Sequence, residues 1–405
     1  MQKDPVARLP EYLEKISFEL DRCIDFWFKH SHDEINGGFF TCLGKDGSIY
    51  DHTKYGWLQG RQVWTYARLY NSVKRFQRQD ILEAAIKGAE FLSQHIKNKE
   101  TQKCAFAVTK SGDPIKYQRT IFTECFYVLG MSELFKASNS DHFKQEAIEM
   151  MSTIVHWLKD DDSYLGNLAL KSDKSISSLA NPMMLMCLID QMRSTIPEIA
   201  TKYEKLEDEC CLEILGHIQR NHSVVLENVS YDFKELSGCQ GRLMNPGHTI
   251  EAGWFLLRYA ELKNDNTLKN TALEIFLEAT FFQGWDNENG GLFYFLDVDG
   301  FSPTQLEWNM KLWWPHCEAM IAFLLAFKET LDKKFLEKFD QVFDYTMKHF
   351  CDPEYGELFG YLSQEGKISM NFKGGPFKGC FHVPRSLMMC ERMLNQIMDQ
   401  GKNNN

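Results

Sequence analysis

The stretch Asn289–Gly300, NGGLFYFLDVDG, repeats the pattern of an earlier stretch, Asn36–Gly47, NGGFFTCLGKDG. Each has Asn-Gly-Gly, then an alternating run rich in aromatic residues, and then Asp-Gly. Glycine adopts positive φ at little cost, so Asp-Gly is typical of the tight turn of a β-hairpin. The chain therefore carries an internal repeat marked by hairpin tips.

Further tips of this kind recur along the chain at steps of 61 to 66 residues. The six tips are Asp46-Gly47, Ser111-Gly112-Asp113, Lys171-Ser172-Asp173, Ser237-Gly238, Asp299-Gly300 and Glu365-Gly366. The copy at Ser237-Gly238 is the weakest, because its flanks, DFKELSGCQG, also suit an ordinary loop. About 60 residues between tips leave room for two helices and their connections.

The segments between the tips show helical periodicity of two kinds. LEAAIKGAEFLSQHI (82–96) and FLEKFDQVFDYTMKHF (335–350) place apolar residues at i, i+3, i+4 and i+7. TIEAGWFLLRYAEL (249–262) and CEAMIAFLLAFKETL (317–331) are apolar nearly all round, which predicts burial on most faces. Six such pairs predict an all-α fold, an (α/α)6 barrel with an inner and an outer ring, in one domain over residues 1–398. An open helical solenoid is the alternative, and 399–405 reads as a disordered tail.

Composition excludes several classes of function. The net charge of −11 argues against binding nucleic acid or an anionic membrane, since both need clustered Lys and Arg. The start of the chain has no apolar signal core, and no apolar run is long enough to span a membrane. The twelve cysteines lack CxxC pairs and zinc spacing, so we expect reduced thiols in a cytoplasmic protein.

Polar and aromatic residues gather where each mostly buried helix should begin. The segments are GWLQGRQVW, YQRTIFTECF, ANPMM, NPGHTIEAGW, KLWWPHCEAM and CFHVPRSL, and their later copies keep a phase of 66 residues. Pro182, Pro246, Pro315 and Pro384 lie near these starts, and proline suits a first helical turn. The inner helices should therefore point their N-termini at one cavity, rimmed by the hairpins.

Several side chains at this cavity have a functional and a structural interpretation. His248, Glu251 and Trp254 share one helical face, so the carboxylate could bond an imidazole or a sugar hydroxyl. A histidine at a helix start is often only a cap or core residue, and Arg61 could form a structural ion pair. The motifs HTIE and HCE offer metal ligands, but a third ligand at suitable spacing is missing, so we expect no metal.

Three long motifs show a closer resemblance. NPGHTIEAGWFLLRYAE, TQLEWNMKLWWPHCEAMIAF and GGPFKGCFHVPRS closely resemble the N-acylglucosamine 2-epimerase family, whose vertebrate members are also called renin-binding proteins. The resemblance covers nearly the whole chain. It implies an (α/α)6 barrel, and interconversion of N-acetyl-D-glucosamine and N-acetyl-D-mannosamine in sialic acid metabolism.

The resemblance also implies roles for particular residues. It places the two catalytic histidines at His248 and His382, with Arg61, Glu251 and Glu318 beside them. The substrate contacts that we expect are Asn181, Trp254, Trp314, His316 and Arg119. The family resemblance further implies no cofactor for the chemistry, activation by a nucleotide such as ATP, a homodimer, and renin as a possible partner.

Inversion at C2 of an N-acetylated sugar needs a proton removed from one face and returned to the other. Two imidazoles suit this task, because a pKa near 6.5 makes both protonation states accessible. The same bases could instead serve an aldose–ketose isomerase, and Glu251 and Glu318 could be the acid pair of a glycoside hydrolase.

A protein-binding role is the remaining alternative. Leu185, Met192, Ile199 and Leu206 recur every seven residues, as in a zipper for dimerisation or for a partner such as renin. Pro197 lies inside this run and should break a continuous helix.

Overall fold

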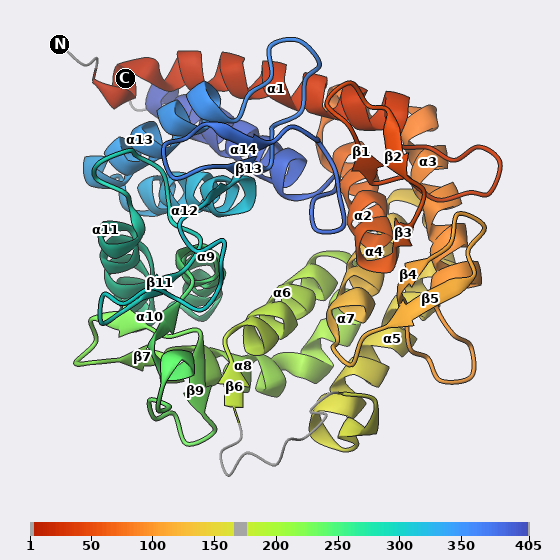
Figure 1. The fold of residues 1–405 in the computed structure, drawn as a ribbon, viewed down its shortest axis with the longest axis horizontal. Coiled ribbons are helices and arrows are strands. Elements are labelled where there is room, and N and C mark those ends of the chain that lie inside the picture. Colours follow the sequence, from red (N-terminus) through yellow and green to blue (C-terminus); the bar gives the residue numbers. More distant parts are fainter. Residues whose placement is uncertain (1–3, 166–175, 404–405) are drawn as a thin grey trace.

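The computed structural model describes residues 4–165 and 176–403, which form a closed ring of helices around a common axis (Figure 1). The first long helix, α1 (Leu9–His30), packs against the last, α14 (His382–Asn403). An open solenoid would keep these two helices apart, so the contact between them closes the ring. The predicted all-α (α/α)6 barrel is confirmed.

The helices alternate between an inner and an outer position along the chain (Figure 1). The inner helices are α2 (Gly56–Ser72), α4 (Phe122–Ser138), α6 (Ala180–Thr195), α9 (Pro246–Lys263), α12 (Trp313–Thr330) and α14. The outer helices are α1, α3 (Gln79–Phe91), α5 (Asp141–Lys159), α8 (Glu204–Gly216), α13 (Lys333–His349), and a segment formed by α10 (Asn266–Thr271), a π-helical stretch and α11 (Thr280–Gly284).

Side-chain burial explains why some helices lie in the inner ring and others in the outer ring. Every residue of α12 from Trp313 to Phe327 is buried, as its all-round apolar sequence predicts. The outer helix α13 buries one stripe that includes Phe335, Phe339 and Phe343, and it exposes charged side chains on its other face. Each helix pair thus buries its apolar surface only by contact with its neighbours in the ring.

Short antiparallel strands lie at the end of the ring where the inner helices begin. They are β1 (Cys42–Leu43), β2 (Ile49–Asp51), β3 (Lys54–Tyr55), β4 (Ala105–Val108), β5 (Pro114–Tyr117), β6 (Ile176–Ser178), β7 (Ile218–Gln219), β8 (Val224–Val225), β9 (Asn228–Ser230), β10 (Leu243–Met244), β11 (Leu296–Asp297), β12 (Lys311–Leu312), β13 (Tyr361–Leu362) and β14 (Ile368–Met370). Strands β3, β10 and β12 lead directly into α2, α9 and α12, and pair with β4, β11 and β13 of the following repeats. This pairing places the starts of the inner helices at one end.

The predicted hairpin tips are confirmed in part. Gly47, Gly112 and Gly366 have positive φ and lie between strands that pair as β1–β2, β4–β5 and β13–β14. The tips at Gly238 and Gly300 also have positive φ, but they are turns in longer loops. There β9 and β11 pair with β6 and β10, so the expectation of a local hairpin at these two tips is wrong. The tip at Lys171–Asp173 lies outside the described residues.

Buried lysines tie the Asn-Gly-Gly turns to the strands before the inner helices. Lys54 Nζ lies 2.8 Å from Asp33 Oδ2 and donates to the carbonyl of Gly37. In the matching place Lys311 Nζ lies 2.9 Å from Asp286 Oδ2 and donates to the carbonyl of Gly291. The lysine ammonium satisfies backbone carbonyls that would otherwise be buried without a donor. The repeated Asn-Gly-Gly turns are therefore structural: they help to hold together the end of the ring where the inner helices begin.

Two predictions about local order meet different outcomes. As Pro197 predicts, the zipper run is broken, because α6 ends at Thr195 and a short α7 (Pro197–Ala200) follows. Leu185, Met192 and Leu206 are buried in the core, so they are not free to form a zipper. The segment expected to be a tail from residue 399 instead continues α14 as far as Asn403.

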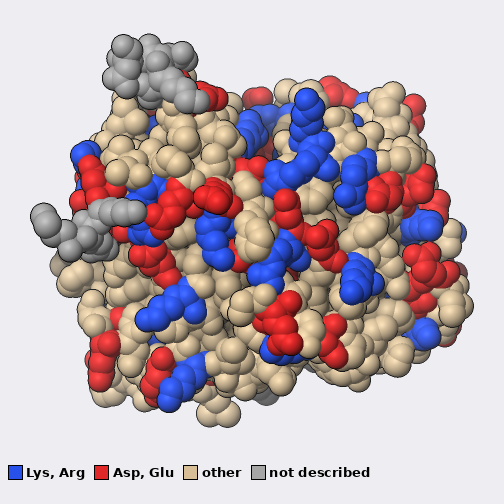
Figure 2. All heavy atoms as spheres, turned by 90° about the horizontal axis from the view of Figure 1, so that it is seen from above, with Lys and Arg blue, Asp and Glu red and all other residues tan. Residues whose placement is uncertain are grey.

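The outer wall carries charges of both signs. Figure 2 views the face above α1, where acidic and basic side chains alternate and no broad field of one sign appears. Lys15 of α1 pairs one helical turn later with Glu19, whose side chain is buried. No helix among the described residues is long and apolar enough to cross a membrane.

Candidate active site

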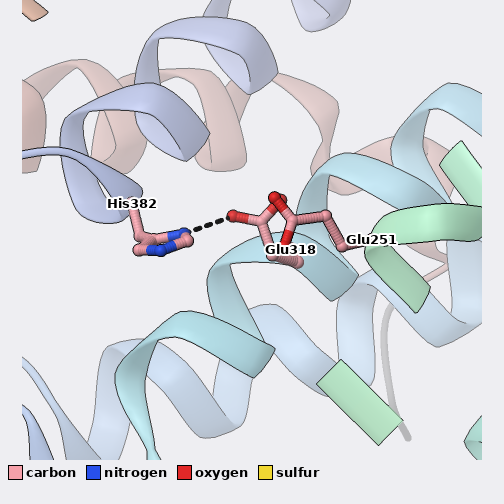
Figure 3. A group of neighbouring side chains, drawn as sticks. All are labelled: Glu251, Glu318 and His382. Carbon is pink, nitrogen blue, oxygen red and sulfur yellow. Dashed lines mark hydrogen bonds and ion pairs between the residues drawn. The ribbon is translucent and has the colours of Figure 1, made fainter. Parts of the chain in front are cut away.

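Three inner helices bring a carboxylate pair and an imidazole together near the centre of the ring. Figure 3 shows Glu251 from α9, Glu318 from α12 and His382 from α14, with Glu318 between the other two. All three side chains are buried. The sequence analysis predicted all three, and the structure places them in one cluster although they are far apart in the chain.

His382 is held by a carboxylate. Its Nδ1 lies 2.8 Å from Glu318 Oε1 (Figure 3). Because an ionised carboxylate only accepts hydrogen bonds, Nδ1 carries the proton and Nε2 is left as the basic nitrogen. Burial, followed by the nearby guanidinium groups of Arg61 and Arg385, lowers the pKa of His382 well below its ordinary value. The imidazole is therefore neutral and suited to accept a proton.

Arg385 joins the two carboxylates. Its Nη2 lies 2.5 Å from Glu251 Oε1 and 2.5 Å from Glu318 Oε1. Burial opposes the charge of Arg385, but Glu318 and Glu251 outweigh burial and raise its pKa. The sequence analysis missed this residue, although it follows His382 by one helical turn inside the quoted motif FHVPRSL. The spacing of three residues on a helix was the available signal.

His248 has a different carboxylate partner. Its Nδ1 lies 3.0 Å from Glu227 Oε1 and 3.1 Å from Oε2. Burial alone would lower the pKa of His248, but Glu227 outweighs burial and the pKa is raised above its ordinary value. Glu227 lies in the loop before β9, outside the repeating helix starts, so no periodicity in the sequence pointed to it.

Trp314 is a ring neighbour of both histidines. Its ring centre is 5.1 Å from that of His248 and 5.8 Å from that of His382. Gly247 permits this placement, because a Cβ there would lie 2.5 Å from the Trp314 indole. Asn245 caps the start of α9 by accepting from the backbone N–H of His248. The two imidazoles therefore both lie against the same indole, which brings the two candidate bases into one site.

Arg61 supplies a buried cation close to the cluster. Its guanidinium lies 4.1 Å from the ring centre of Phe126 and 4.5 Å from that of Trp57. Burial and the proximity of Arg385 lower its pKa to about 9, so the side chain is charged at neutral pH. Its buried Nε has no hydrogen-bond partner among the described residues. The structural ion pair considered for Arg61 is thus absent from the described part, and a donor is available there for an anion.

The predicted substrate contact at His316 is wrong on physical grounds. His316 is fully buried, its Nδ1 donates to the carbonyl of Leu312, and its Nε2 accepts from the N–H of Leu292. Both ring nitrogens are occupied by backbone, and burial lowers the pKa of the side chain to about 3. His316 is a structural residue that ties α12 to the Asn-Gly-Gly turn.

The other predicted substrate contacts lie in different places. Trp254 is buried and donates from Nε1 to Glu318 Oε2 at 3.0 Å, so it orients that carboxylate. Arg119 is exposed and donates to the carbonyls of Ser163 and Leu165 rather than into the cluster. Asn181 is exposed in the first turn of α6.

The carboxylates and imidazole of this cluster could also be considered as metal ligands. Glu251, Glu318 and His382 each place one ligand atom within 4.8 Å of the others. However, Arg385 donates to both carboxylates and already supplies a positive charge beside them. The donor set is therefore poorly suited to a divalent ion, which would have to displace a buried guanidinium.

Comparisons with known proteins agree with this geometry. Residues 38–383 match the family model described as N-acylglucosamine 2-epimerase. The chain is 53% identical to N-acylglucosamine 2-epimerase of Mus musculus, over 97% of this chain and 94% of that protein. It is 52% identical to the Homo sapiens enzyme of that name, over 97% and 92% of the two chains. Among solved structures, cellobiose 2-epimerase of Bacillus thermoamylovorans superposes with a TM-score of 0.82 at 16% identity, covering 95% of this chain and 99% of that chain.

Proposed function

The chain belongs to the N-acylglucosamine 2-epimerase family, and we propose that it interconverts N-acetyl-D-glucosamine and N-acetyl-D-mannosamine. The observation that carries the proposal is the pair His248 and His382. Each is held at Nδ1 by a carboxylate, and both lie beside the indole of Trp314.

The chemistry requires ring opening of the sugar, because the proton at C2 becomes acidic only when C1 is a carbonyl. One imidazole then removes the C2 proton, giving an enediolate-type anion, and the other imidazole returns a proton to the opposite face. General acid–base catalysis of this kind contributes roughly 10²- to 10⁴-fold. The remainder comes from orientation and from stabilising the negative charge that develops on the oxygen at C1.

The two histidines begin a turnover in different states. His382 has a lowered pKa and acts as the base, whereas His248 has a raised pKa and acts as the acid. A turnover in this direction leaves His382 protonated and His248 neutral, which is the state needed for the reverse reaction. Arg61, charged and without an ion pair among the described residues, would stabilise the enediolate oxygen.

The carboxylates favour this reaction over glycoside hydrolysis. A hydrolase needs one carboxyl group free to protonate the leaving oxygen and a second one across the cleft. Here Glu251 and Glu318 bind the same Arg385 guanidinium, so neither carboxyl group is free for that role. An aldose–ketose isomerase would use the same two bases, so the identity of the product separates that reaction from epimerisation.

The test is nuclear magnetic resonance of N-acetylmannosamine with enzyme in deuterated water. We expect N-acetylglucosamine carrying deuterium at C2, and a ketose product would identify an isomerase instead. His248→Asn and His382→Asn should each lower the epimerisation rate by about 10²-fold or more. His156→Asn, at an exposed histidine of α5, is the matched control and should have no effect. Full epimerisation by either active-site variant would contradict the two-base assignment.

The family resemblance supports further proposals about the biological setting. We propose a role in sialic acid metabolism in the cytoplasm, a homodimer, activation by ATP, and renin as a possible partner. Sedimentation analysis tests the dimer and renin binding, and epimerisation assays with and without ATP test the activation.

A further inference from the structure

His217 is a fully buried histidine outside the group of catalytic side chains. It follows the outer helix α8 directly as its C-cap. Its Nδ1 lies 2.7 Å from the carbonyl oxygen of Leu226. In return, the backbone N–H of Leu226 donates to the carbonyl of His217 at 3.0 Å. Two hydrogen bonds therefore join His217 to the residue that directly precedes Glu227.

The bond to the carbonyl fixes the tautomer of His217. A carbonyl oxygen can only accept, so Nδ1 carries the proton and Nε2 is left as an acceptor. This Nε2 is buried and has no hydrogen-bond partner among the described residues. Burial lowers the pKa of His217 and outweighs the opposing effects of Leu226 and Glu227. The imidazole is therefore neutral at physiological pH.

Neither packing nor the helix dipole accounts for a histidine at this position. A leucine would fill much of the same space without leaving a buried nitrogen unpartnered, which costs free energy. A cation is favourable at a helix C-terminus, but a neutral imidazole gains little from that effect. What the side chain of His217 contributes is the hydrogen bond from Nδ1 to Leu226.

The main chain of Glu227 is attached to two further elements. Its backbone N–H donates to the carbonyl of Leu243 on β10 at 2.8 Å, and its carbonyl accepts from the N–H of Leu179 at 3.0 Å. These bonds tie it to the strand before α9 and to the residue before α6. The bonds of His217 to the preceding residue add a third attachment, to α8. The carboxylate 3.0 Å from His248 Nδ1 is thus held from three sides.

The hairpin between His217 and Leu226 needs support at its base. Its strands are β7 and β8. Three successive residues at its tip have positive φ, namely Arg220 at 51°, Asn221 at 56° and His222 at 64°. Residues other than glycine rarely adopt this conformation, which persists only where surrounding contacts hold it. The two hydrogen bonds between His217 and Leu226 close the hairpin next to Glu227.

We propose that His217 is a positioning residue, which holds Glu227 against His248 through its hydrogen bonds to Leu226. His217 does not touch the substrate, because it acts only through the backbone that carries the Glu227 carboxylate. The proposal rests on the roles of His248 and His382 in the proposed function.

The position of Glu227 matters for the charge state of His248. Burial lowers the pKa of His248, while Glu227, followed by Glu251, raises it. His382 on α14 also faces His248, and it is neutral in the resting state described above. A Glu227 that moves away would therefore leave His248 with a lower pKa and a poorer hold on its proton.

Two variants of nearly the same shape separate the hydrogen bond from packing. His217→Asn keeps an N–H donor close to the place of Nδ1, whereas His217→Leu has no donor there. In His217→Leu the alkaline limb of kcat/KM, which reports the acid His248, should move to lower pH by about 0.5 to 1 unit. At pH 8 the value should fall about 3- to 10-fold. His217→Asn should restore the original profile, and the acidic limb, which reports the base His382, should stay in place in both variants.

His349→Leu is the matched control. His349 ends the outer helix α13, and its Nδ1 donates to the carbonyl of Gly366 at a hairpin tip, at 3.0 Å. It thus makes the same kind of bond in another repeat, away from Glu227. Its loss should lower Tm and leave both limbs of the pH profile unmoved.

A second measurement does not depend on the reaction. The Cε1–H resonance of His248, assigned by its absence from His248→Asn, reports the pKa of this imidazole directly in a nuclear magnetic resonance titration. We expect this pKa to fall in His217→Leu and to return in His217→Asn. A protein that catalysed a different reaction would still give this result, so the positioning role and the proposed function can fail separately.

Three results would overturn the positioning role. They are a rate loss in His217→Leu with the alkaline limb and the His248 pKa unmoved, an equal shift in His217→Leu and His217→Asn, and the same shift in His349→Leu. If His217→Leu does not fold, His217→Gln takes its place with the same expected shift, because its amide nitrogen lies near the place of Nε2 rather than of Nδ1.

Discussion

His248 and His382 are the same side chain at the same end of the ring, and a carboxylate holds Nδ1 in both. Their charge states nevertheless differ, because the pKa of His248 is raised and that of His382 is lowered. The presence of a carboxylate therefore does not decide the protonation state of an imidazole.

The difference follows from what else each carboxylate binds. Within the described part of the chain no Lys or Arg pairs with Glu227, so its full negative charge acts on His248. Glu318 shares its charge with Arg385, and Arg61 adds a second cation near His382. The net charge around each imidazole sets its pKa, and the site obtains an acid and a base from one residue type.

The largest expected effect comes from Glu318→Gln, which removes the charge behind His382. A Gln amide could donate to Nδ1 and leave the proton on Nε2, which would abolish the base. We expect the epimerisation rate to fall about 10³-fold or more, as for loss of the carboxylate behind a catalytic histidine. The variant should also leave the buried charge of Arg385 partly unpaired. Deuterium exchange at C2 measures the rate, and circular dichroism checks the fold. Glu329→Gln, near the far end of the same helix, should retain activity; equal loss in both variants would point to a general defect of α12.

A smaller effect is expected from Glu227→Gln, which acts on His248. Without the carboxylate charge of Glu227 burial dominates, so the pKa of His248 should fall. The alkaline limb of the rate profile, where a general acid loses its proton, should therefore move to lower pH. We expect a loss of about 10- to 100-fold, as for removal of a supporting hydrogen bond. The pH dependence of kcat/KM measures both changes. Glu235→Gln, in the loop that follows and paired with Arg220 at the surface, is the matched control. A rate loss with an unmoved pH profile would assign Glu227 a purely structural role.

Trp314→Phe should have a modest effect, because the smaller ring still packs against both imidazoles but with less surface. Aromatic pairs are worth about 0.5–1.5 kcal/mol, so we expect kcat/KM to fall about 2- to 10-fold. Steady-state kinetics in both directions measure the change. Trp157→Phe on the outer helix α5 should leave the kinetics unaltered. A loss of about 10²-fold would show that Trp314 does more than pack against the two imidazoles.

The smallest effect on the chemistry is expected at His316, a fully buried histidine, which should instead govern stability. Its pKa is about 3 in the fold and about 6.5 when unfolded, so between these values only the unfolded chain binds a proton. The free energy of unfolding should therefore fall as pH drops below 6.5, by up to about 1.4 kcal/mol per pH unit. His316→Gln should flatten this slope in Tm measurements from pH 7 to 5, whereas His156→Gln should not. An unchanged slope would show that His316 is not buried in the neutral form.

The repeat made most of the fold predictable. Helical periodicity and the spaced glycine turns depend on residues close in sequence, so the helix pairs and their common direction could be inferred. The prediction of local hairpins at Gly238 and Gly300 was wrong, because the strands next to these turns pair with strands of other repeats. Strand pairing between repeats leaves little trace in local sequence.

The site residues could be predicted where their place at the start of an inner helix was enough to bring them together. His248, Glu251, Glu318 and His382 stand at helix starts, and closure of the ring brings all helix starts together. His316 stands at such a start too, yet its ring turns to the backbone of a neighbouring turn. Phase along the chain reports where a residue lies, but it does not report which way the side chain points.

The sequence by itself determined the barrel, the end at which the helices begin, and two histidines with carboxylates nearby. Only the tertiary structure decided that Arg385 binds both carboxylates, that Glu227 supports His248, and that the two imidazoles differ in charge. The physical reason is the range of the forces. Helix formation is encoded by neighbours three and four residues apart, whereas a pKa depends on every charge within several ångströms, and here those charges come from four helices and a loop.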